Sequence, residues 1–352
     1  MHSYDVIVVG GGVIGGAISY YLSKQGVRVL AVEQRTLGYG ASSKAAGMLA
    51  VEAEYQPDHP LYDLAMESRR QLKELAQLFL DELGIDIGFE QNGMLLLGSK
   101  GSLTLEDMRE LEPKLRTKEA GVHYEEGAQI RSKQLTLAYW RAAIANGVEV
   151  LEQTDVKRLL MKEGRVCGIE TSSQKFYADT VIVASGVASS ELLPGLCPLL
   201  PVKGEIISVT TEKRLLQRTI YARDCYLVPK GENELLIGAT SYPGDGTEGV
   251  SLEGVMGLLA RATALVPELA KAKWNETWSG VRPRTFDDLP YIGRHPEIQG
   301  LVMATGHYRN GMLLSAITGQ LVSDLVWNNR VPEALAPVSP ERRGVVEHGL
   351  AY

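Results

Sequence analysis

Cysteine is scarce in this chain of 352 residues, with three copies at Cys167, Cys197 and Cys225. They lie far apart in the sequence and form no CxxC pair. This pattern argues against a disulfide framework and against a zinc site, and it is typical of a reducing compartment. The first residues, Met-His-Ser-Tyr-Asp, also lack the basic segment of a signal peptide. We therefore expect a cytoplasmic protein with no bound metal.

Positive charge is in deficit, and long apolar runs are missing. The chain has 36 Lys and Arg against 43 Asp and Glu, a formal net charge of −7 at pH 7. Proteins that bind a phosphate backbone need an excess of positive charge, so we expect no nucleic-acid partner. The longest early apolar run, residues 6–18, has 13 residues including five glycines, which is too short to cross a bilayer. We expect no membrane partner either.

The overall composition is that of an ordinary globular protein. Hydrophobic residues make up 45 % of the chain and charged residues 22 %, which excludes a disordered or fibrous protein. At roughly 100–200 residues per domain, the length predicts about two domains.

The beginning of the chain follows the order strand, glycine-rich turn, helix, strand. Residues 4–9 contain a β-branched run of the kind that is buried on both faces in a parallel sheet. Residues 17–25 have helical periodicity and precede Gly26, a residue type common at helix C-termini. Residues 27–32 are a second apolar run. This order predicts a βαβ unit.

The turn after the first strand carries the spacing G-x-G-x-x-G at Gly10, Gly12 and Gly15. The first glycine allows a tight turn, the second lets a pyrophosphate approach, and the third lets the helix pack closely on the sheet. Free N–H groups and the positive end of the helix dipole attract phosphates. Glu33 lies 18 residues after Gly15 and can accept hydrogen bonds from ribose hydroxyls. We interpret the motif as a dinucleotide site rather than a structural turn.

Residues 38–48 are rich in Gly, Ala and Ser. Small side chains permit close approach to a flat ligand, and the same composition is typical of a flexible surface loop. On composition alone, the flexible loop is the better interpretation.

The rest of the chain alternates helical patterns with strand patterns. Helices are predicted at residues 60–83 and 134–146, and strands at 94–97, 148–151 and 180–186. A hairpin is predicted from 155–160 to 166–170, with a turn at Glu163 and Gly164. Further strands are expected at 202–209, 225–230, 234–239 and 274–281, before a final strand and helix at 301–327.

This order predicts an α/β (α+β) fold with two domains. The first is a Rossmann-like nucleotide-binding domain with a parallel sheet, made from residues 1–85, 130–200 and 285–352. The second is a β-rich, antiparallel substrate-binding domain, made from residues 86–129 and 201–284. Enzymes of this kind bind ligands between the two parts.

Two late segments hold arginines in informative places. Arg282 is followed by a proline near a strand end, and a planar guanidinium can hold both oxygens of a carboxylate. Residues 306–314 contain Arg309 and occupy a strand-to-helix turn, where ligands bind in α/β folds. An isolated arginine is more often part of a surface salt bridge, and we assign Arg284 and Arg294 to that class.

An ordered set of motifs resembles the D-amino-acid oxidase family of flavoproteins, and it is particularly similar to the bacterial glycine oxidases linked to thiamine biosynthesis. The resemblance covers nearly the whole chain. Its motifs are VVGGGVIG at 8–15, AAGML at 45–49, VASG at 183–186, PVKGE at 201–205, CYLVP at 225–229, LIGAT at 236–240, RP at 282–283, PYIGRHP at 290–296 and GHYRNG at 306–311.

The resemblance implies a non-covalent FAD that lies across the sheet. The segment from Arg309 to Thr318 contains no cysteine, in keeping with a flavin that is not covalently attached. The residues implied to contact the cofactor are Gly10, Gly12, Val13, Ile14, Gly15, Glu33, Gln34, Ala41, Ser42, Ala46, Gly47, Met48, Val156, His307, Tyr308, Arg309, Asn310, Gly311, Met312 and Leu313.

The resemblance also implies a substrate site. It assigns Arg282 to the substrate carboxylate and gives Tyr226 and Arg309 catalytic and substrate-binding roles. It places the backbone of Ala50 at the border of the substrate. No metal is implied.

The implied function is FAD-dependent oxidative deamination of glycine and other small amines, such as sarcosine and small D-amino acids. A hydride passes from the substrate to flavin, O2 is reduced to H2O2, and the imine yields glyoxylate and ammonia. The implied partners are the small substrate, O2, a thiazole synthase that receives the imine, and further copies of this chain in a homotetramer.

Three alternatives stay open. They are a sarcosine or other secondary-amine oxidase, a dehydrogenase that passes electrons to a partner protein, and a flavin-binding module without catalysis. Asp224 stands where close family members have histidine, and Ser241 stands where one has methionine. These departures leave the preferred amine open.

Overall fold

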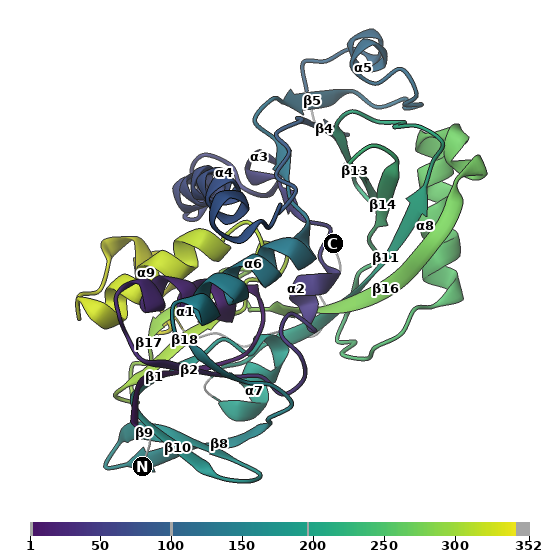
Figure 1. The fold of residues 1–352 in the computed structure, drawn as a ribbon. Helices are drawn as coiled ribbons and strands as arrows, with labels where there is room; N and C mark the ends of the chain where they lie inside the picture. Colours follow the sequence, from purple (N-terminus) through teal and green to yellow (C-terminus); the bar gives the residue numbers. More distant parts are fainter. Residues whose placement is uncertain (1–2, 99–100, 196, 343–352) are drawn as a thin grey trace.

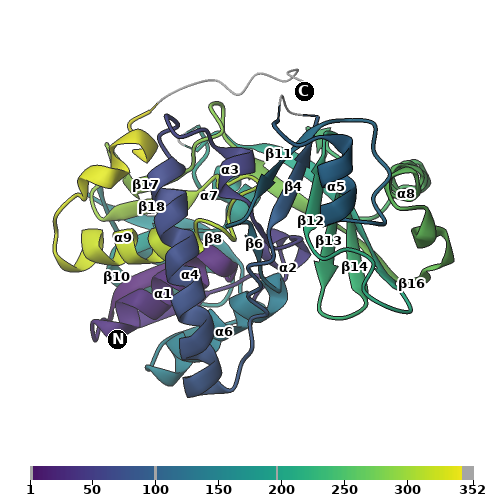
Figure 2. The ribbon, with the colours of Figure 1, turned by 90° about the horizontal axis from the view of Figure 1, so that it is seen from above.

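Two large sheets lie next to each other and organise the fold, as two perpendicular views show (Figures 1 and 2). The computed structural model describes residues 3–98, 101–195 and 197–342. The first sheet takes its strands from residues 3–32, 149–183 and 291–305. The second takes its strands from residues 94–124 and 200–284. The boundaries given above for the two domains stay a prediction.

The first sheet has the strand order β17-β18-β10-β1-β2-β7, and the hairpin of β8 and β9 extends from β10. Strands β7, β2, β1, β10 and β18 run parallel. The run Val6–Val9 is buried, as expected for the centre of a covered parallel sheet. The bounds are β1 (Ser3–Val9), β2 (Val29–Val32), β7 (Glu149–Leu151), β8 (Val156–Lys162), β9 (Arg165–Thr171), β10 (Lys175–Val183), β17 (Tyr291–Arg294) and β18 (Leu301–Thr305).

Three strand pairs of this sheet are antiparallel, and one of them is the predicted hairpin of residues 155–160 and 166–170. Strand β9 runs antiparallel to both β8 and β10, and β17 runs antiparallel to β18. Glu163 and Gly164 both have positive φ (50° and 77°) and form the tight turn from β8 to β9. Such a short connection can join only antiparallel neighbours.

Helices cover one face of the first sheet in two layers (Figure 1). Helix α1 (Val13–Lys24) contacts α6 (Ser132–Ala145) and α9 (Ser315–Trp327), and the long α4 (Tyr62–Leu83) packs on α6 and α9. The aromatic rings of Tyr20, Phe79 and Tyr139 meet between these helices, with centroids 5.4–5.9 Å apart. Each such ring pair contributes about 0.5–1.5 kcal/mol beyond simple burial.

The second sheet has the order β15-β11-β14-β13-β12-β4-β5, with β16 paired to β11. Its pairs are antiparallel except for β12 with β4. The bounds are β4 (Met94–Leu97), β5 (Gly121–Tyr124), β11 (Leu200–Thr210), β12 (Thr219–Ala222), β13 (Cys225–Lys230), β14 (Glu234–Gly238), β15 (Tyr242–Pro243) and β16 (Lys273–Arg284).

The two faces of the second sheet have different neighbours, because side chains alternate along each strand. Ile207 of β11 faces helix α8 (Leu252–Leu265) and shares an apolar cluster with Leu258. The adjacent Ile206 belongs to a separate cluster with Ala46, which comes from the first part of the chain. The face with Ile206 is therefore the one that meets the nucleotide-binding half.

The segment 38–48 is structured, so its interpretation as a flexible loop is wrong. It contains α2 (Ala41–Lys44) and enters β3 (Met48–Leu49), which pairs with β6 (Ala128–Gln129). The amide of Ile130 donates to the Gly47 carbonyl, and the hydroxyl of Ser132 donates to the Ala45 carbonyl, both at 2.8 Å. Backbone hydrogen bonds to another segment hold the chain here, and composition does not reveal them.

The remaining helical elements are short. They are α3 (Val51–Glu54), α5 (Leu105–Leu111), η1 (Gly186–Ala188), α7 (Ser189–Leu192), η2 (Pro267–Lys271) and η3 (Glu333–Val338). Within residues 3–98, 101–195 and 197–342, no helix is both long enough and apolar enough to cross a membrane.

Candidate active site

A cavity of about 970 Å³ lies between the two halves of the molecule. Ligand pockets usually measure roughly 300–1,000 Å³, so this one has room for a large cofactor together with a small substrate. The predicted substrate residues Ala50, Tyr226, Arg282 and Arg309 all line it. The predicted cofactor residues that line it are Gly10, Gly12, Val13, Ile14, Glu33, Gln34, Ala41, Ser42, Ala46, Gly47, Met48, Val156, His307, Tyr308, Arg309, Asn310, Gly311 and Met312.

Two predicted cofactor residues, Gly15 and Leu313, lie behind the cavity wall. A Cβ on Gly15 would sit 1.9 Å from the carbonyl oxygen of Gly10, so this glycine allows α1 to pack against the turn. Leu313 is 1 % exposed and belongs to the core under the helices. Neither residue is among those that line the cavity, so their packing is what the structure shows, and their contact with the cofactor stays a prediction.

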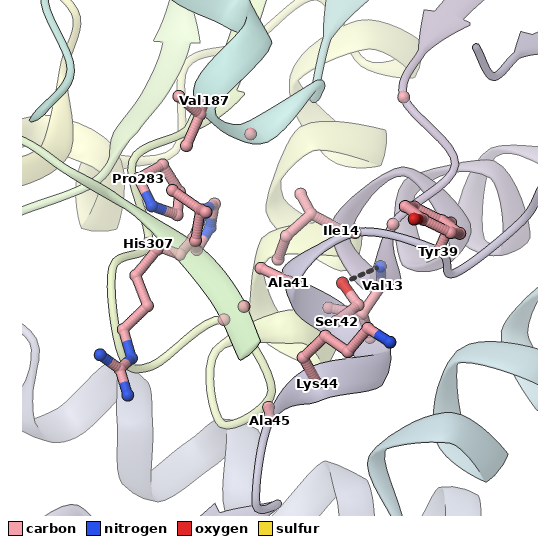
Figure 3. Close-up of a pocket in the computed structure, with 18 of the residues that line it drawn as sticks. Val13, Ile14, Tyr39, Ala41, Ser42, Lys44, Ala45, Val187, Pro283 and His307 are labelled. Carbon is pink, nitrogen blue, oxygen red and sulfur yellow. Dashed lines mark hydrogen bonds between the residues drawn. The ribbon is translucent and has the colours of Figure 1, made fainter. Parts of the chain in front are cut away.

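The N-terminus of α1 forms one end of the cavity. Its cap residue, Gly12, supplies no side-chain hydrogen bond, and the first turn contains no acidic residue. The amide of Val13 donates to the Ser42 hydroxyl at 2.9 Å (Figure 3). Gly10 has φ +120°, and a Cβ there would sit 2.4 Å from the Ala184 carbonyl oxygen. The turn therefore presents backbone and a positive helix end to the cavity, an arrangement that binds phosphates.

Glu33 stands beside this turn at the end of β2. Its carboxylate accepts hydrogen bonds from the amides of Gly11 (2.6 Å) and Arg35 (2.8 Å). The opposite side of the turn is supported by Trp140, whose indole N–H donates to the Gly11 carbonyl at 2.9 Å. The acid is thus held in a fixed place on the cavity wall, where a ribose hydroxyl can reach it.

Helix α2 forms a second side of the cavity. Figure 3 shows Ala41, Ser42 and Lys44 grouped near Val13 and Ile14, with Pro283 and His307 farther along the wall. The indole of Trp278 in β16 donates to the Lys44 carbonyl at 2.9 Å. The small residues of segment 38–48 therefore let α2 approach β16 and α1 closely.

His307 begins the turn that follows β18, and the turn runs to α9 at Ser315. Its ring nitrogen Nε2 lies 3.1 Å from the hydroxyl of Thr318, and the residue is buried. Burial lowers the pKa of His307 to about 3. The ring is thus neutral at physiological pH, and it shapes this wall without adding charge.

Arg282 and Tyr226 project into the cavity from the second sheet, and each lies over a glycine of a neighbouring strand. A Cβ on Gly204 would sit 2.2 Å from Nη2 of Arg282, and a Cβ on Gly238 would sit 2.5 Å from the Tyr226 hydroxyl. A glycine inside a strand permits such a close approach. Removal of water around the hydroxyl raises the pKa of Tyr226 to about 12, even though Arg282 opposes the shift. Tyr226 therefore remains a hydrogen-bond donor.

Arg282 and Arg309, two of the arginines that line the cavity, differ in their partners. Nη2 of Arg309 lies 3.0 Å from Oε1 of Glu54, another wall residue. Arg282 donates to the Thr240 carbonyl at 3.4 Å, and no ion pair to it is found among the described residues. Arg282 therefore presents an uncompensated positive charge to the cavity.

Comparison with known proteins connects this geometry to a family. The family model "FAD dependent oxidoreductase" (DAO) matches residues 5–325. The chain belongs to this family. It is 42 % identical to glycine oxidase from Geobacillus kaustophilus, over 97 % of both chains. The crystal structure of that organism's glycine oxidase superposes with a TM-score of 0.91 at 40 % identity, covering 97 % of this chain and 100 % of the other.

A bifunctional ThiO/ThiG protein from Synechocystis is a further relative. It is 33 % identical over 96 % of this chain and 54 % of its own length. The family match and these relatives confirm three predictions: the α/β two-domain fold, the FAD-dependent oxidoreductase activity and FAD as the cofactor.

The residues of this family member fit an FAD. The glycine-lined turn and the start of α1, whose cap residue Gly12 has no side chain, can hold its phosphates, and Glu33 can hold a ribose. The wall formed by residues 41–48 and 306–312 supplies small side chains and backbone for a flat ring. These assignments of individual residues to parts of FAD remain predictions.

Sequence reasoning missed several residues of the site. Gly204 and Gly238 make room for the two polar side chains, and a glycine inside a strand pattern is a sequence signal for such close approach. Glu54 and Trp278 contact their partners across more than 200 residues of sequence. No local pattern predicts contacts of that range.

Four residues that the sequence analysis did not assign to the site can now be located in the structure. Arg284 forms the expected salt bridge with Asp288, at 2.6 Å. No acidic partner of Arg294 is found in the part of the chain that the structure describes. Its guanidinium donates to the Leu325 carbonyl near the end of α9, where the last carbonyls of the helix lack helical partners. Asp224 is exposed and outside the cavity wall formed by the described residues, and Ser241 lies beside the wall residue Tyr308.

Proposed function

We propose that this chain oxidises glycine and other small amino acids or amines to the imine, with O2 as the electron acceptor. The observation that carries the proposal is Arg282, a cavity arginine without an acidic partner among the described residues. A guanidinium fork binds both oxygens of a carboxylate. The relatives named glycine oxidase support glycine as the amino acid.

Arg282 holds the substrate carboxylate and so fixes the orientation of the amine and of Cα. Tyr226, kept protonated, can donate a hydrogen bond to the same carboxylate. A bound FAD would supply a two-electron acceptor for the hydride of Cα while the amine nitrogen loses a proton, and O2 would take up the two electrons and two protons as H2O2. The imine then hydrolyses to glyoxylate and ammonia. The chain mainly orients the reactants, and orientation alone supplies much of the rate in such reactions.

We include three finer elements in the proposal: hand-off of the glycine imine to a thiazole synthase, a homotetramer and a cytoplasmic location. The relative named ThiO/ThiG supports the first, because it joins the two activities in one chain. Gel filtration with light scattering tests the homotetramer. Pull-down of the separate synthase tests the hand-off.

A peroxide-coupled assay over glycine, sarcosine, D-alanine and D-proline tests the proposed reaction. Peroxide with glycine supports it, and peroxide with none of the four contradicts it. Arg282→Ala removes a charge-assisted pair worth roughly 1.5–3 kcal/mol, so the Michaelis constant for glycine should rise at least about tenfold. Arg282→Lys keeps the positive charge but loses the planar guanidinium. Its Michaelis constant for glycine should lie between those of the wild type and Arg282→Ala. Flavin absorbance should be retained in both variants.

A further inference from the structure

Glu54 lies at the end of the short helix α3, which is firmly anchored. Arg69 of α4 donates from Nη1 and Nη2 to the two carboxylate oxygens of Glu52, each at 2.8 Å. The side chains of Arg69 and Glu52 are only 6 % and 15 % exposed. A bidentate pair of this kind fixes both partners in direction as well as distance. Helix α3 therefore presents Glu54 to the cavity from a fixed position.

Glu54 connects α3 to the cavity wall at residues 309–310 and to Tyr221 of strand β12. Its Oε1 accepts hydrogen bonds from Arg309 Nη2 and from the Tyr221 hydroxyl, each at 3.0 Å. Its Oε2 accepts from Asn310 at 3.5 Å. The Glu54 side chain is 15 % exposed and Arg309 is 40 % exposed. The carboxylate is thus committed to groups of the protein, and Arg309 is its charged partner.

A chain of contacts relates this pair to Arg282. The guanidinium of Arg309 lies 5.8 Å from the Tyr221 ring centroid, and the Tyr221 and Tyr226 rings are 6.4 Å apart. The charges of both Arg282 and Glu54 act on the pKa of Tyr226: Arg282 lowers it and Glu54 raises it. Two positive charges and one negative charge therefore surround the substrate end of the cavity. One positive charge, on Arg282, remains free, which matches a substrate with one carboxylate.

The geometry points to Glu54 as a specificity-determining residue that neutralises Arg309 and thereby restricts the enzyme to amines with a single carboxylate. The inference rests on the proposed function, because it assigns Arg282 to the first carboxylate. Replacing Glu54 by glutamine would release Arg309 to bind a second carboxylate. The Tyr221 ring, whose centroid lies 5.8 Å from the Arg309 guanidinium, would still attract this arginine when its acidic partner is gone.

Two substrates that differ by one charge give a direct test. N-ethylglycine and iminodiacetate are both N-substituted glycines of similar size, and iminodiacetate carries the second carboxylate. We expect the ratio of kcat/KM for iminodiacetate to that for N-ethylglycine to rise about tenfold in Glu54→Gln. The double variant Glu54→Gln/Arg309→Met should return the ratio to the wild-type value. Glu248→Gln is the matched control, because it removes another wall carboxylate that pairs with Arg35 and not with Arg309.

Binding gives a readout that does not depend on turnover. Malonate and acetate are titrated into the oxidised holoenzyme, and the shift of the flavin absorbance spectrum gives each dissociation constant. The affinity for malonate relative to acetate should rise about tenfold in Glu54→Gln and should not change in Glu248→Gln. Flavin content and thermal unfolding show whether each variant is folded.

The outcomes separate the two hypotheses. An unchanged ratio in folded Glu54→Gln, in both turnover and binding, overturns the role of Glu54. A gain that persists in the double variant also overturns it, because Arg309 would not be the receptor. Absence of turnover with every amine, together with the expected gain in malonate binding, contradicts the proposed function and supports the role of Glu54.

Discussion

The two ends of the cavity are lined by different chemical groups. At the α1 end, the wall is backbone and small side chains, placed by glycines such as Gly10 that cannot carry a Cβ. At the opposite end, the wall is made of long polar side chains, Arg282, Tyr226, Arg309 and Glu54, from different parts of the chain. The first end follows from local sequence spacing. The second depends on how distant strands and helices come together.

The largest expected effect concerns the backbone end. Gly15→Ala would place a Cβ 1.9 Å from the Gly10 carbonyl oxygen, so α1 must move away from the turn. We expect a loss of stability on the order of 3 kcal/mol or more, and loss of flavin from the purified protein. Thermal unfolding and the flavin-to-protein absorbance ratio measure both. Gly257→Ala on α8, next to the flexible end of Arg261, should keep its flavin. A yellow, stable Gly15→Ala protein would contradict the account of this end.

A second prediction concerns the buried His307 between the two ends. Its pKa is about 3 in the folded protein, against an ordinary value of 6.5, so the unfolded chain binds its proton first as the pH falls. Stability from this group is complete above pH 6.5 and falls between pH 6.5 and pH 3. Between pH 7 and pH 5 the loss should be about 2 kcal/mol. His307→Gln should abolish that part of the pH dependence in denaturant unfolding. His59 is a less buried histidine, so His59→Gln should change the pH dependence of unfolding less than His307→Gln does.

A third prediction tests the end of the cavity that holds Arg282, without altering a polar side chain. Gly204→Ala would place a Cβ 2.2 Å from the Arg282 guanidinium and displace it. The Michaelis constant for glycine should rise about tenfold, because small misplacements of a binding group are costly. Flavin content should stay at the wild-type level. Wild-type kinetics in this variant would show that the close packing of Arg282 on β11 is unimportant.

The smallest expected effect concerns an exposed ion pair between the two halves of the molecule. Arg35 and Glu248 lie 3.4 Å apart, with side chains 52 % and 63 % exposed. Exposed pairs of this kind contribute about 0–1 kcal/mol. Glu248→Gln should therefore lower the free energy of unfolding by less than about 0.5 kcal/mol. A larger loss in denaturant unfolding would mean that this contact holds the halves together.

The same contrast explains what the sequence predicted. The βαβ unit was predicted from a local glycine spacing, and nearly all the predicted cofactor residues, most of them taken from motif resemblance, line the cavity. Glu54 was missed because its partner Arg309 lies far along the chain. Helix α8 was missed because Leu252 and Met256 point into solvent, which blurs the apolar stripe formed by Leu258 and Ala262. Tertiary contacts decide such positions, and local periodicity does not reveal them.

The most direct test of the central claim is an anaerobic titration of the holoenzyme with glycine, followed by flavin absorbance. We expect glycine to bleach the wild-type flavin. In Arg282→Ala, half-bleaching should need at least about tenfold more glycine, with the flavin still bound. Bleaching of both proteins at the same glycine concentration would contradict the role of Arg282. No bleaching of the wild-type flavin at any glycine concentration would contradict the proposed reaction.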